Sequence, residues 1–464
     1  MSVLGAVIVP HPPIILPEIG KGEEKKIGKT IEAYRKVARM VADWNPNTVV
    51  ITSPHTVLYA DYFHISPGKK AEGDFLSFGA PNVRITADYD QLFVEELMKR
   101  ARRAHLPAGT FGEQGPELDH ATMIPLRFLQ EAGVSCKVIR VGLSGLSALT
   151  HYRLGKCISE TAEALQRKIV FVASGDLSHK LLESGPYGFS EDGPRFDHQV
   201  TEAMKTGDFL KFLEFSEPFC ESAAECGLRS FQIMAGGLDG LSVSPELLSY
   251  EGTFGVGYAV ASFSVTGKDE SRHFDRFYEE QENQRVMQKR QQEDPYVRLA
   301  RKSLETFVET GKRLSLQNLL TQLPEELREK KAGAFVSIHQ EGRLRGCIGT
   351  IEPVFSCLAE EIIHNAVSAG SADPRFSPVR KEELPSLEYS VDVLEKPEKI
   401  SSPEELNVKK YGVIVSDGER RGLLLPNLEG VTSVKQQIEI AREKAGIGKN
   451  QSYSLERFKV VRHF

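Results

Sequence analysis

The first part of the chain alternates short, continuous apolar runs with longer segments of helical periodicity. The apolar runs cover residues 3–9, 48–51, 135–141, 168–173 and 257–265. Runs of this length without polar alternation are typical of parallel strands that are buried on both faces. Helical spacing of apolar residues covers residues 23–42, 91–103, 148–165 and 221–238. This alternation predicts an α/β sandwich with a mostly parallel central sheet over residues 1–266.

The pattern changes after residue 266. Residues 267–294 are polar and densely charged, which is typical of either a solvent-exposed helix or a flexible linker. Residues 295–464 then form a second unit, in which we expect helices over 296–310 and 432–445 and strands over 333–339, 389–394 and 412–415. This second unit is predicted to be a smaller α+β domain.

Composition fits an ordinary globular protein of two to three domains, with 464 residues, 40% hydrophobic and 26% charged. A net charge of −6 argues against nucleic acid or an anionic membrane as the partner. No apolar run approaches the ~18 residues of a membrane span, and the N-terminus lacks the features of a signal peptide. The six cysteines are scattered, which is typical of a reducing compartment, so we expect a cytoplasmic protein.

Two histidines follow two of the predicted strands. His11 lies just after the strand at 3–9, within Pro-His-Pro-Pro, and His55 lies just after the strand at 48–51, within Ser-Pro-His. Ligands bind beyond the carboxyl ends of the strands in open α/β sheets. Two imidazoles there could hold one metal ion, although each histidine alone could equally be an ordinary loop residue.

Two further histidines extend this candidate site. His179 follows the strand at 168–173 in Ser-Gly-Asp-Leu-Ser-His, and it is a candidate general base because imidazole titrates near neutral pH. His120 follows Asp119 at the start of a helix and could donate a hydrogen bond to a substrate oxyanion. The structural alternative is that Asp119 caps the helix and His120 has no chemical role.

A third metal ligand is expected from the adjacent pair Glu225 and Cys226. Two histidines and one carboxylate suit non-haem Fe(II), whereas Zn²⁺ also accepts two histidines with either Glu or Cys. The structural alternatives are a solvated helix face for Glu225 and a small packed side chain for Cys226.

The Pro-His-Pro-Pro, Ser-Pro-His, Leu-Asp-His and Gly-Asp-Leu-Ser-His motifs resemble those of class III extradiol ring-cleaving dioxygenases and the related Memo proteins, over residues 1–266. This resemblance implies that His11 and His55 are metal ligands, that His179 is the acid/base and that His120 lies on the substrate side. The dioxygenases use a glutamate as third ligand, which points to Glu225, whereas Memo proteins carry Cys-Gly, which points to Cys226. Fe(II) is the expected metal, with zinc or copper as alternatives.

The second unit carries a distinctive hexapeptide, Leu-Arg-Gly-Cys-Ile-Gly, over residues 344–349. Its Cys347 could be an activated thiol, and Arg345, Arg375 and Arg420 could form an anion site. The structural alternative is that the glycines serve a turn, Cys347 packs in the core and Asp373 pairs with Arg375.

Together with Asp-Pro-Arg-Phe at 373–376 and Arg-Gly-Leu-Leu-Leu-Pro at 421–426, the hexapeptide resembles the AMMECR family domain over residues 295–464. A Memo-like and an AMMECR-like domain in one chain resemble the AmmeMemoRadiSam arrangement, which implies a separate radical S-adenosylmethionine protein as partner. The chain itself lacks the Cys-x3-Cys-x2-Cys motif of such an enzyme.

Three functions follow as hypotheses. The first is a metal-dependent enzyme, resembling the extradiol dioxygenases, that acts on a small catechol-like or enolisable hydroxy substrate. The second is a non-catalytic metal-binding or scaffold protein of the Memo type, with the second unit as an adaptor. The third assigns the chemistry to Cys347. The sequence leaves the oligomeric state open.

Overall fold

The computed structural model describes residues 1–428 and 430–464. The chain divides into two compact units, Met1–Glu279 and Glu280–Phe464. None of the helices that the structure describes combines the length and the apolar composition of a membrane span.

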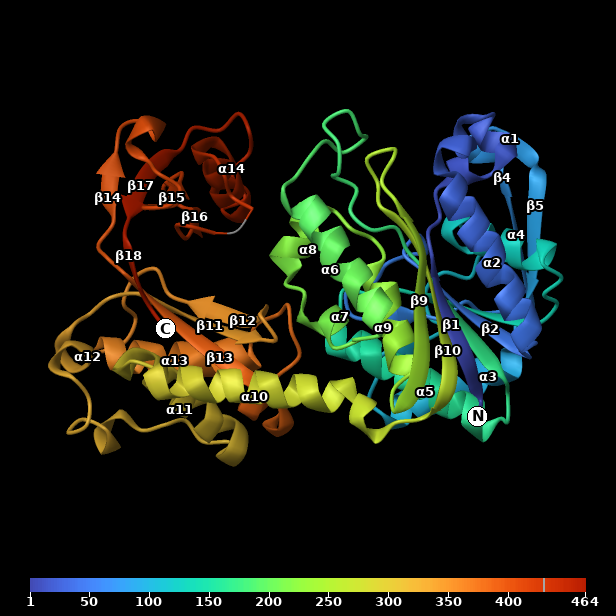
Figure 1. Cartoon of the computed structure of the whole chain (residues 1–464). Coiled ribbons are helices and arrows are strands. Elements are labelled where there is room, and N and C mark those ends of the chain that lie inside the picture. The colour runs from blue at the N-terminus through green and yellow to red at the C-terminus, as the bar shows by residue number, and fades with distance from the viewer. Residues whose placement is uncertain (429) are drawn as a thin grey trace. The chain divides into compact units, whose positions relative to one another are not determined.

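A six-stranded sheet with the order β7-β2-β8-β1-β10-β9 forms the centre of the first unit (Figure 1). Strands β7, β2, β8 and β1 pair in parallel, whereas β10 pairs antiparallel with both β1 and β9. The predicted α/β class with a mostly parallel central sheet is therefore confirmed. The strands are β1 Val3–Val9, β2 Thr48–Ser53, β7 Lys137–Gly142, β8 Ile169–Ser174, β9 Leu241–Glu251 and β10 Tyr258–Lys268.

Helices cover both faces of this sheet. Neighbouring residues of each strand point to opposite faces, and because both sets are apolar, each face must be buried against helices. Ala6 and Ile8 of β1 pack in one apolar cluster with α3, α5, α6 and α9, and Val7 and Val9 pack in the other with α2 and α4. The helices of this unit are α1 Pro17–Gly20, α2 Gly28–Trp44, α3 Gln91–Arg103, α4 His120–Glu131, α5 Ala148–Ala164, α6 Asp192–Thr206, α7 Lys211–Glu214, α8 Glu217–Ala223 and α9 Leu228–Gly237. A separate antiparallel hairpin is formed by β4 Lys70–Phe75 and β5 Ala80–Asp88, and the two-residue strands β3 Phe63–His64 and β6 Ala108–Gly109 pair in parallel.

Two of the differences from the predicted elements have a clear local cause. The single helix expected over residues 221–238 is two helices, because Ala224 adopts a left-handed conformation (φ 53°) that ends α8 before α9 begins. The composition could not reveal this break, since alanine favours helix. Strand β9 was missed because its residues alternate between partly buried and exposed and include Pro245, so they form no continuous apolar run.

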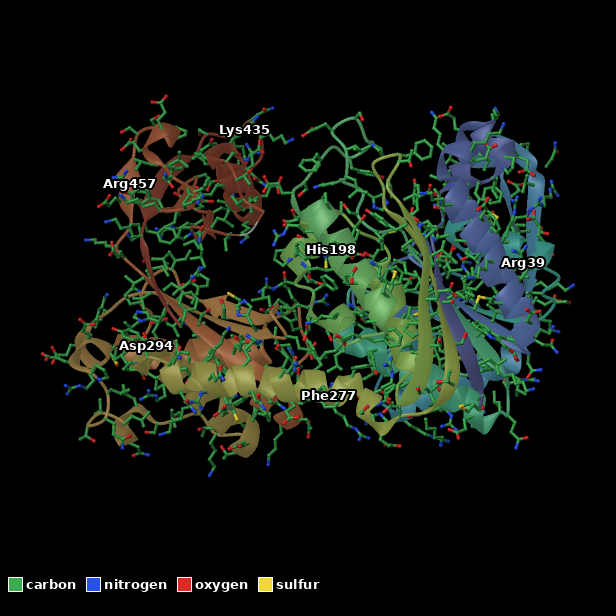
Figure 2. All side chains as sticks on the ribbon, viewed as in Figure 1. Arg39, His198, Phe277, Asp294, Lys435 and Arg457 are labelled. Carbon is green, nitrogen blue, oxygen red and sulfur yellow. The ribbon has the colours of Figure 1, made fainter. Side chains whose placement is uncertain are left out.

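The second unit contains two antiparallel four-stranded sheets, β12-β11-β13-β18 and β14-β17-β15-β16. Helices α11 and α13 pack on the first sheet, and α14 packs on the second. Asp294, labelled in Figure 2, caps α11 by accepting the Tyr296 and Val297 amide hydrogens at 2.9 and 3.0 Å. The elements are α11 Pro295–Thr310, α12 Glu325–Glu329, β11 Ala334–Gln340, β12 Arg343–Gly349, α13 Leu358–Ser371, β13 Leu387–Leu394, β14 Glu398–Ile400, β15 Gly412–Ser416, β16 Arg421–Leu424, α14 Val434–Lys444, β17 Ser454–Phe458 and β18 Val460–His463.

The charged segment contains helix α10, Phe274–Gln292, so the helical alternative is the one that the structure adopts. The boundary between the two units falls within this helix. On the side of the second unit, Arg290 donates to the Leu384 carbonyl oxygen at 2.6 Å and both Arg285 and Lys289 pair with Glu388.

Helices α5 and α9 pack so closely that a side chain on Gly236 is excluded. A Cβ atom there would lie 1.8 Å from the Tyr152 carbonyl oxygen. We expect Gly236→Ala to destabilise the first unit by about 1–3 kcal/mol, the usual cost of overpacking a core. Gly28→Ala is the control, because Gly28 has a helical conformation (φ −61°) and nothing near its Cβ position. Urea unfolding followed by circular dichroism measures both, and equal midpoints in the two variants would contradict this packing constraint.

Candidate metal centre

The loops after β1, β2 and β8 meet at one edge of the central sheet. The parallel register sets Val9, the last residue of β1, beside Ser174, the last residue of β8. His11, His55 and His179 follow these strand ends. The strand register therefore brings together three histidines that are far apart in the sequence.

Three ligand atoms form the centre of this edge. His11 Nε2 lies 3.2 Å from His55 Nε2 and 3.7 Å from Cys226 Sγ, and all three atoms lie within 4.8 Å of one another. A tetrahedral ion with ordinary bond lengths would hold two ligand nitrogens about 3.3 Å apart and a nitrogen and a sulfur about 3.6 Å apart. The spacing of these side chains fits a transition-metal ion.

Hydrogen bonds fix the ring orientation of His11, whose side chain is only 2% exposed. The Ser174 hydroxyl donates to the Ala121 carbonyl oxygen at 2.7 Å, so its 3.0 Å contact with His11 Nδ1 requires the imidazole to donate. Neutral His11 thus carries its proton on Nδ1 and turns the Nε2 lone pair towards His55 and Cys226. Burial, together with the neighbouring His55, lowers the pKa of His11 well below its usual value, so the ring stays in the form that binds metals.

Cys226 reaches the histidines because two loops touch through their backbones. A Cβ atom on Gly175 would lie 2.2 Å from the Cα atom of Gly227, so a side chain there would push the loops apart. In this arrangement Cys226 Sγ accepts the Asp176 amide hydrogen at 3.3 Å. Burial, followed by the Asp176 and Glu225 charges, raises the pKa of the Cys226 thiol well above its usual value.

Glu225, the other expected third ligand, does not belong to this group of three ligand atoms. Its carboxylate accepts the Leu228 amide hydrogen at 2.7 Å, at the start of α9, and burial raises its pKa. The structure thus brings Cys226, and not Glu225, to the two histidines. The two expected ligands separate because adjacent side chains point in different directions.

Asp176 belongs to this centre and was not singled out in the sequence. Its carboxylate accepts the His11 amide hydrogen at 2.8 Å and reaches within 3.9 Å of His11 Nε2. Burial raises its pKa. The sequence feature that could have identified Asp176 is its position in the same polar loop as His179, directly after a buried strand.

His120 lies next to the two ligand histidines, and His179 acts on one of them, because it helps to lower the pKa of His11. His179 Nδ1 lies 3.1 Å from the Leu177 carbonyl oxygen, which can only accept, so Nδ1 carries the proton and Nε2 is free to take one. The His120 ring lies 4.2 Å from that of His55 and 5.6 Å from that of His11. Burial, with His55 and His11 adding to it, lowers the pKa of His120 to about 4.

The predicted cap at Asp119 is confirmed at the start of α4, and the same carboxylate makes further contacts. Its carboxylate accepts the Thr122 amide hydrogen at 3.0 Å and the Ser53 hydroxyl hydrogen at 2.6 Å, and it pairs with Arg140 at 3.0 Å. Burial acts to raise the pKa of Asp119, but Arg140 and these hydrogen bonds outweigh it and hold the pKa below its usual value. Asp119 therefore ties the end of β2, next to His55, to the first turn of α4, which carries His120.

The three arginines singled out in the second unit do not form an open anion site. Each guanidinium pairs with a carboxylate of its own, at 2.8 to 2.9 Å: Arg345 with Glu383, Arg375 with Asp373 and Arg420 with Asp417. The Asp373–Arg375 pair expected as the structural alternative is confirmed.

Cys347 lacks the features of an activated thiol. It lies half-buried on β12, where its sulfur accepts the Ser337 hydroxyl hydrogen at 3.2 Å. Burial raises its pKa despite that hydrogen bond and the nearby Arg375. A protonated thiol is a poor nucleophile, so this position does not favour catalysis by Cys347.

A second group of potential ligands, Asp239, His273 and Asp275, lies elsewhere in the first unit. The Lys156 ammonium lies 3.0 Å from Asp239 and 2.6 Å from Asp275, where it already supplies the positive charge that these carboxylates need. This group is therefore an ion-pair network and not a metal site. A cavity of about 650 Å³ between the β4–β5 hairpin and α4 is lined by none of the histidines.

Comparison with known proteins adds two family matches. The model described as the catalytic LigB subunit of aromatic ring-opening dioxygenase matches residues 5–261, and the AMMECR1 model matches residues 297–463. A protein of Clostridium acetobutylicum is 40% identical and aligns over 100% of this chain and 99% of its own length. A protein of Thermotoga maritima is 46% identical over 37% of this chain and 98% of its own length. An uncharacterized protein of Pyrococcus horikoshii of known structure is 32% identical over 36% of this chain and 88% of its own, with a TM-score of 0.34.

The lowered pKa of His120 predicts how the stability of the metal-free protein depends on pH. The folded state keeps His120 neutral down to about pH 4, whereas an unfolded histidine takes up a proton near pH 6.5. Its contribution to stability is thus complete above pH 6.5 and is lost as the pH falls towards 4. We expect His120→Gln to lose less stability than wild type between pH 7 and pH 5.

Urea midpoints of the metal-free protein at the two pH values measure this effect. His198→Gln, at an exposed position of α6 labelled in Figure 2, is the matched control and should follow wild type. A parallel loss in His120→Gln and wild type would contradict the assignment of a neutral His120.

The raised pKa of Cys347 predicts slow reaction with iodoacetamide at pH 7.5, slower than that of free glutathione, and a marked acceleration at pH 9.5. Mass spectrometry of the peptide that contains Cys347 gives the rate. Alkylation faster than that of glutathione at pH 7.5 would instead identify an activated thiol.

Proposed function

Because the chain belongs to the family of the catalytic LigB subunit of aromatic ring-opening dioxygenases and continues into an AMMECR1 domain, we propose that its first unit is a metal-dependent enzyme. The proposed substrate class is a small catechol-like or enolisable hydroxy compound. The observation that carries the proposal is the convergence of His11 Nε2, His55 Nε2 and Cys226 Sγ within 4.8 Å of one another.

His11, His55 and Cys226 are the proposed ligands. Three protein ligands leave coordination positions open for substrate, which is the arrangement of catalytic rather than structural metal sites. Two imidazoles and a thiolate are ligands typical of zinc and copper, and imidazole also binds iron. We propose Fe(II) because the family carries out ring opening. The bound ion would supply Lewis-acid polarisation of the substrate oxygens.

Three further residues have proposed roles in proton transfer, in substrate binding and in holding a ligand loop. His179 is the proposed general base: its Nδ1–H is held by the Leu177 carbonyl oxygen, so Nε2 can take the proton of a substrate hydroxyl. His120 stays neutral because its pKa is lowered to about 4, and it can therefore donate one N–H to a substrate oxygen without adding a charge. Asp176 holds the His11 loop through the His11 amide at 2.8 Å.

A second function, metal binding without turnover, is favoured by Cys226. The ring-opening dioxygenases that the sequence resembles use a carboxylate at this place, whereas a thiolate ligand is typical of the Memo-like alternative. In that case the AMMECR1 domain would serve partner recognition, with a radical S-adenosylmethionine protein as the proposed partner. A wild-type protein that binds metal but shows no turnover in any condition tested would favour this alternative.

Metal content after anaerobic purification tests the ligand set. We expect about one iron per chain in wild type, none in the His11→Ala/His55→Ala double variant, and a large loss in Cys226→Ser. Glu225→Gln is the matched control, because glutamine can still accept the Leu228 amide hydrogen and the variant should keep its metal. Metal that persists in Cys226→Ser and disappears in Glu225→Gln would make Glu225 the ligand instead.

His179→Gln tests the proposed base. We expect this variant to keep its metal and its affinity for catechol but to lose oxygen uptake with catechol by about 10²–10⁴-fold, the usual contribution of a general base. Calorimetry measures the affinity and an oxygen electrode measures the turnover. Unchanged oxygen uptake would remove His179 from the chemistry.

A further inference from the structure

Asp197 is a buried carboxylate of α6, outside the group of three ligand atoms. The residue is 1% exposed, and α6 packs against α8 and β9 (Figure 1), with the neighbouring His198 labelled in Figure 2. Its Oδ1 accepts the Ser178 amide hydrogen at 2.8 Å, and its Oδ2 accepts the hydroxyl hydrogen of Tyr250 of β9 at 2.7 Å. Among the residues that the structure describes, no lysine, arginine or histidine pairs with this carboxylate. A buried carboxylate is costly without donors, so these two hydrogen bonds hold it in place.

The loop that carries His179 is fixed at Ser178 from both sides of its backbone. Asp197 accepts the amide hydrogen of Ser178, and the Ser178 carbonyl oxygen accepts the Gly257 amide hydrogen at 2.8 Å. Gly257 lies so close that a Cβ atom there would stand 2.1 Å from Asp197 Oδ2. Because Ser178 is held through both its N–H and its C=O, the direction in which the chain enters His179, the next residue, is set.

Ser178 also reaches the segment that carries Cys226. Its hydroxyl donates to the Ala223 carbonyl oxygen at 2.8 Å, and the His179 amide donates to the same oxygen at 3.2 Å. Ala223 ends α8, and the left-handed residue Ala224 that follows leads into Cys226 two positions later. Ser178 thus joins the loop of the proposed base to the segment of the proposed ligand.

We propose that Asp197 is a positioning residue that sets His179 and Cys226 together, through its hydrogen bond to Ser178. The inference rests on the proposed function and adds to it a residue that acts on the site only through Ser178. Ser178 is fully buried, so its amide hydrogen would lack a partner without the carboxylate, and the loop would have to move to satisfy it. That movement would shift the Ala223 contact, and with it the segment of Cys226.

An asparagine can replace the carboxylate in this role. Its Oδ1 can accept the Ser178 amide hydrogen, and its Nδ2 can donate to the Tyr250 hydroxyl, which rotates to accept. Burial raises the pKa of Asp197 to about 7, so a neutral side chain here resembles a state that the protein itself populates near neutral pH. Alanine and leucine offer no acceptor, and leucine preserves more of the buried volume.

Binding of Co²⁺ to the metal-free full chain tests the effect on Cys226. The visible absorption of Co²⁺ reports its coordination geometry, and a near-ultraviolet charge-transfer band reports a thiolate ligand. We expect Asp197→Ala to bind Co²⁺ about 10–100-fold more weakly, the usual effect of losing a residue that holds a metal ligand in place, and to show a weaker charge-transfer band at saturation. Asp197→Asn should restore both. Gly236→Ala is the control, because it strains the packing of α5 and α9 and should keep the affinity and the spectrum.

Nitrogen-15 spectra of the histidine rings in the metal-free protein test the effect on His179. The spectra are recorded at pH 8, where an ordinary histidine is neutral. Wild type should hold His179 in the Nδ1–H form, because Nδ1 lies 3.1 Å from the Leu177 carbonyl oxygen. Asp197→Ala should give a mixture of the two neutral tautomers, and Asp197→Asn should return the single form. The signal that disappears in His179→Gln assigns the resonance.

The outcomes separate this inference from the proposed function. Wild-type affinity, spectrum and tautomer in Asp197→Ala would overturn the inference, as would a loss of equal size in Asp197→Asn or Gly236→Ala. A change in one readout alone would overturn the joint role. If wild type binds no metal, the proposed function fails, and the tautomer alone then decides whether Asp197 sets His179.

The folding of each variant is checked first by circular dichroism. If Asp197→Ala does not fold, Asp197→Leu takes its place under the same criteria. Failure of both variants to fold would assign Asp197 to folding alone and overturn the inference.

Discussion

The parallel register of β1, β2 and β8 is the constraint on which the candidate centre depends. These strands are buried on both faces, and their residues alternate between two apolar clusters. A slip of one residue would turn each side chain to the opposite face, so the core fixes the register. The strand ends, and with them His11, His55 and the loop of Asp176 and His179, are then held by the packing of helices on both faces of the sheet.

Much of this arrangement could be predicted from the sequence, because continuous apolar runs identify buried parallel strands and polar loops at their ends identify the edge that binds ligands. The choice between Glu225 and Cys226 could not. Composition gives no sign that Ala224 adopts a left-handed conformation, or that Gly175 and Gly227 bring two loops into backbone contact. These local features turn Cys226 towards His11 and leave Glu225 to cap α9.

The second unit illustrates a different limit of sequence interpretation. Arg345, Arg375 and Cys347 were candidates because their residue types suit anion binding and nucleophilic chemistry. The sequence does not show that Arg345 pairs with Glu383, 38 positions away, or that burial raises the pKa of Cys347. The short-range Asp373–Arg375 pair could be predicted because its partners are two residues apart. Long-range pairing thus decides which charged residues remain free for function.

The protonated state of Cys226 has a consequence for how this centre would acquire its ion. Burial and two neighbouring carboxylates keep the thiol protonated, whereas a sulfur ligand must be a thiolate. Loading would therefore be an exchange reaction in which one ion enters and one proton leaves. The apparent affinity would change by about tenfold for each pH unit below the thiol pKa. The same burial that raises the pKa of the thiol would make metal binding by these three residues depend on pH.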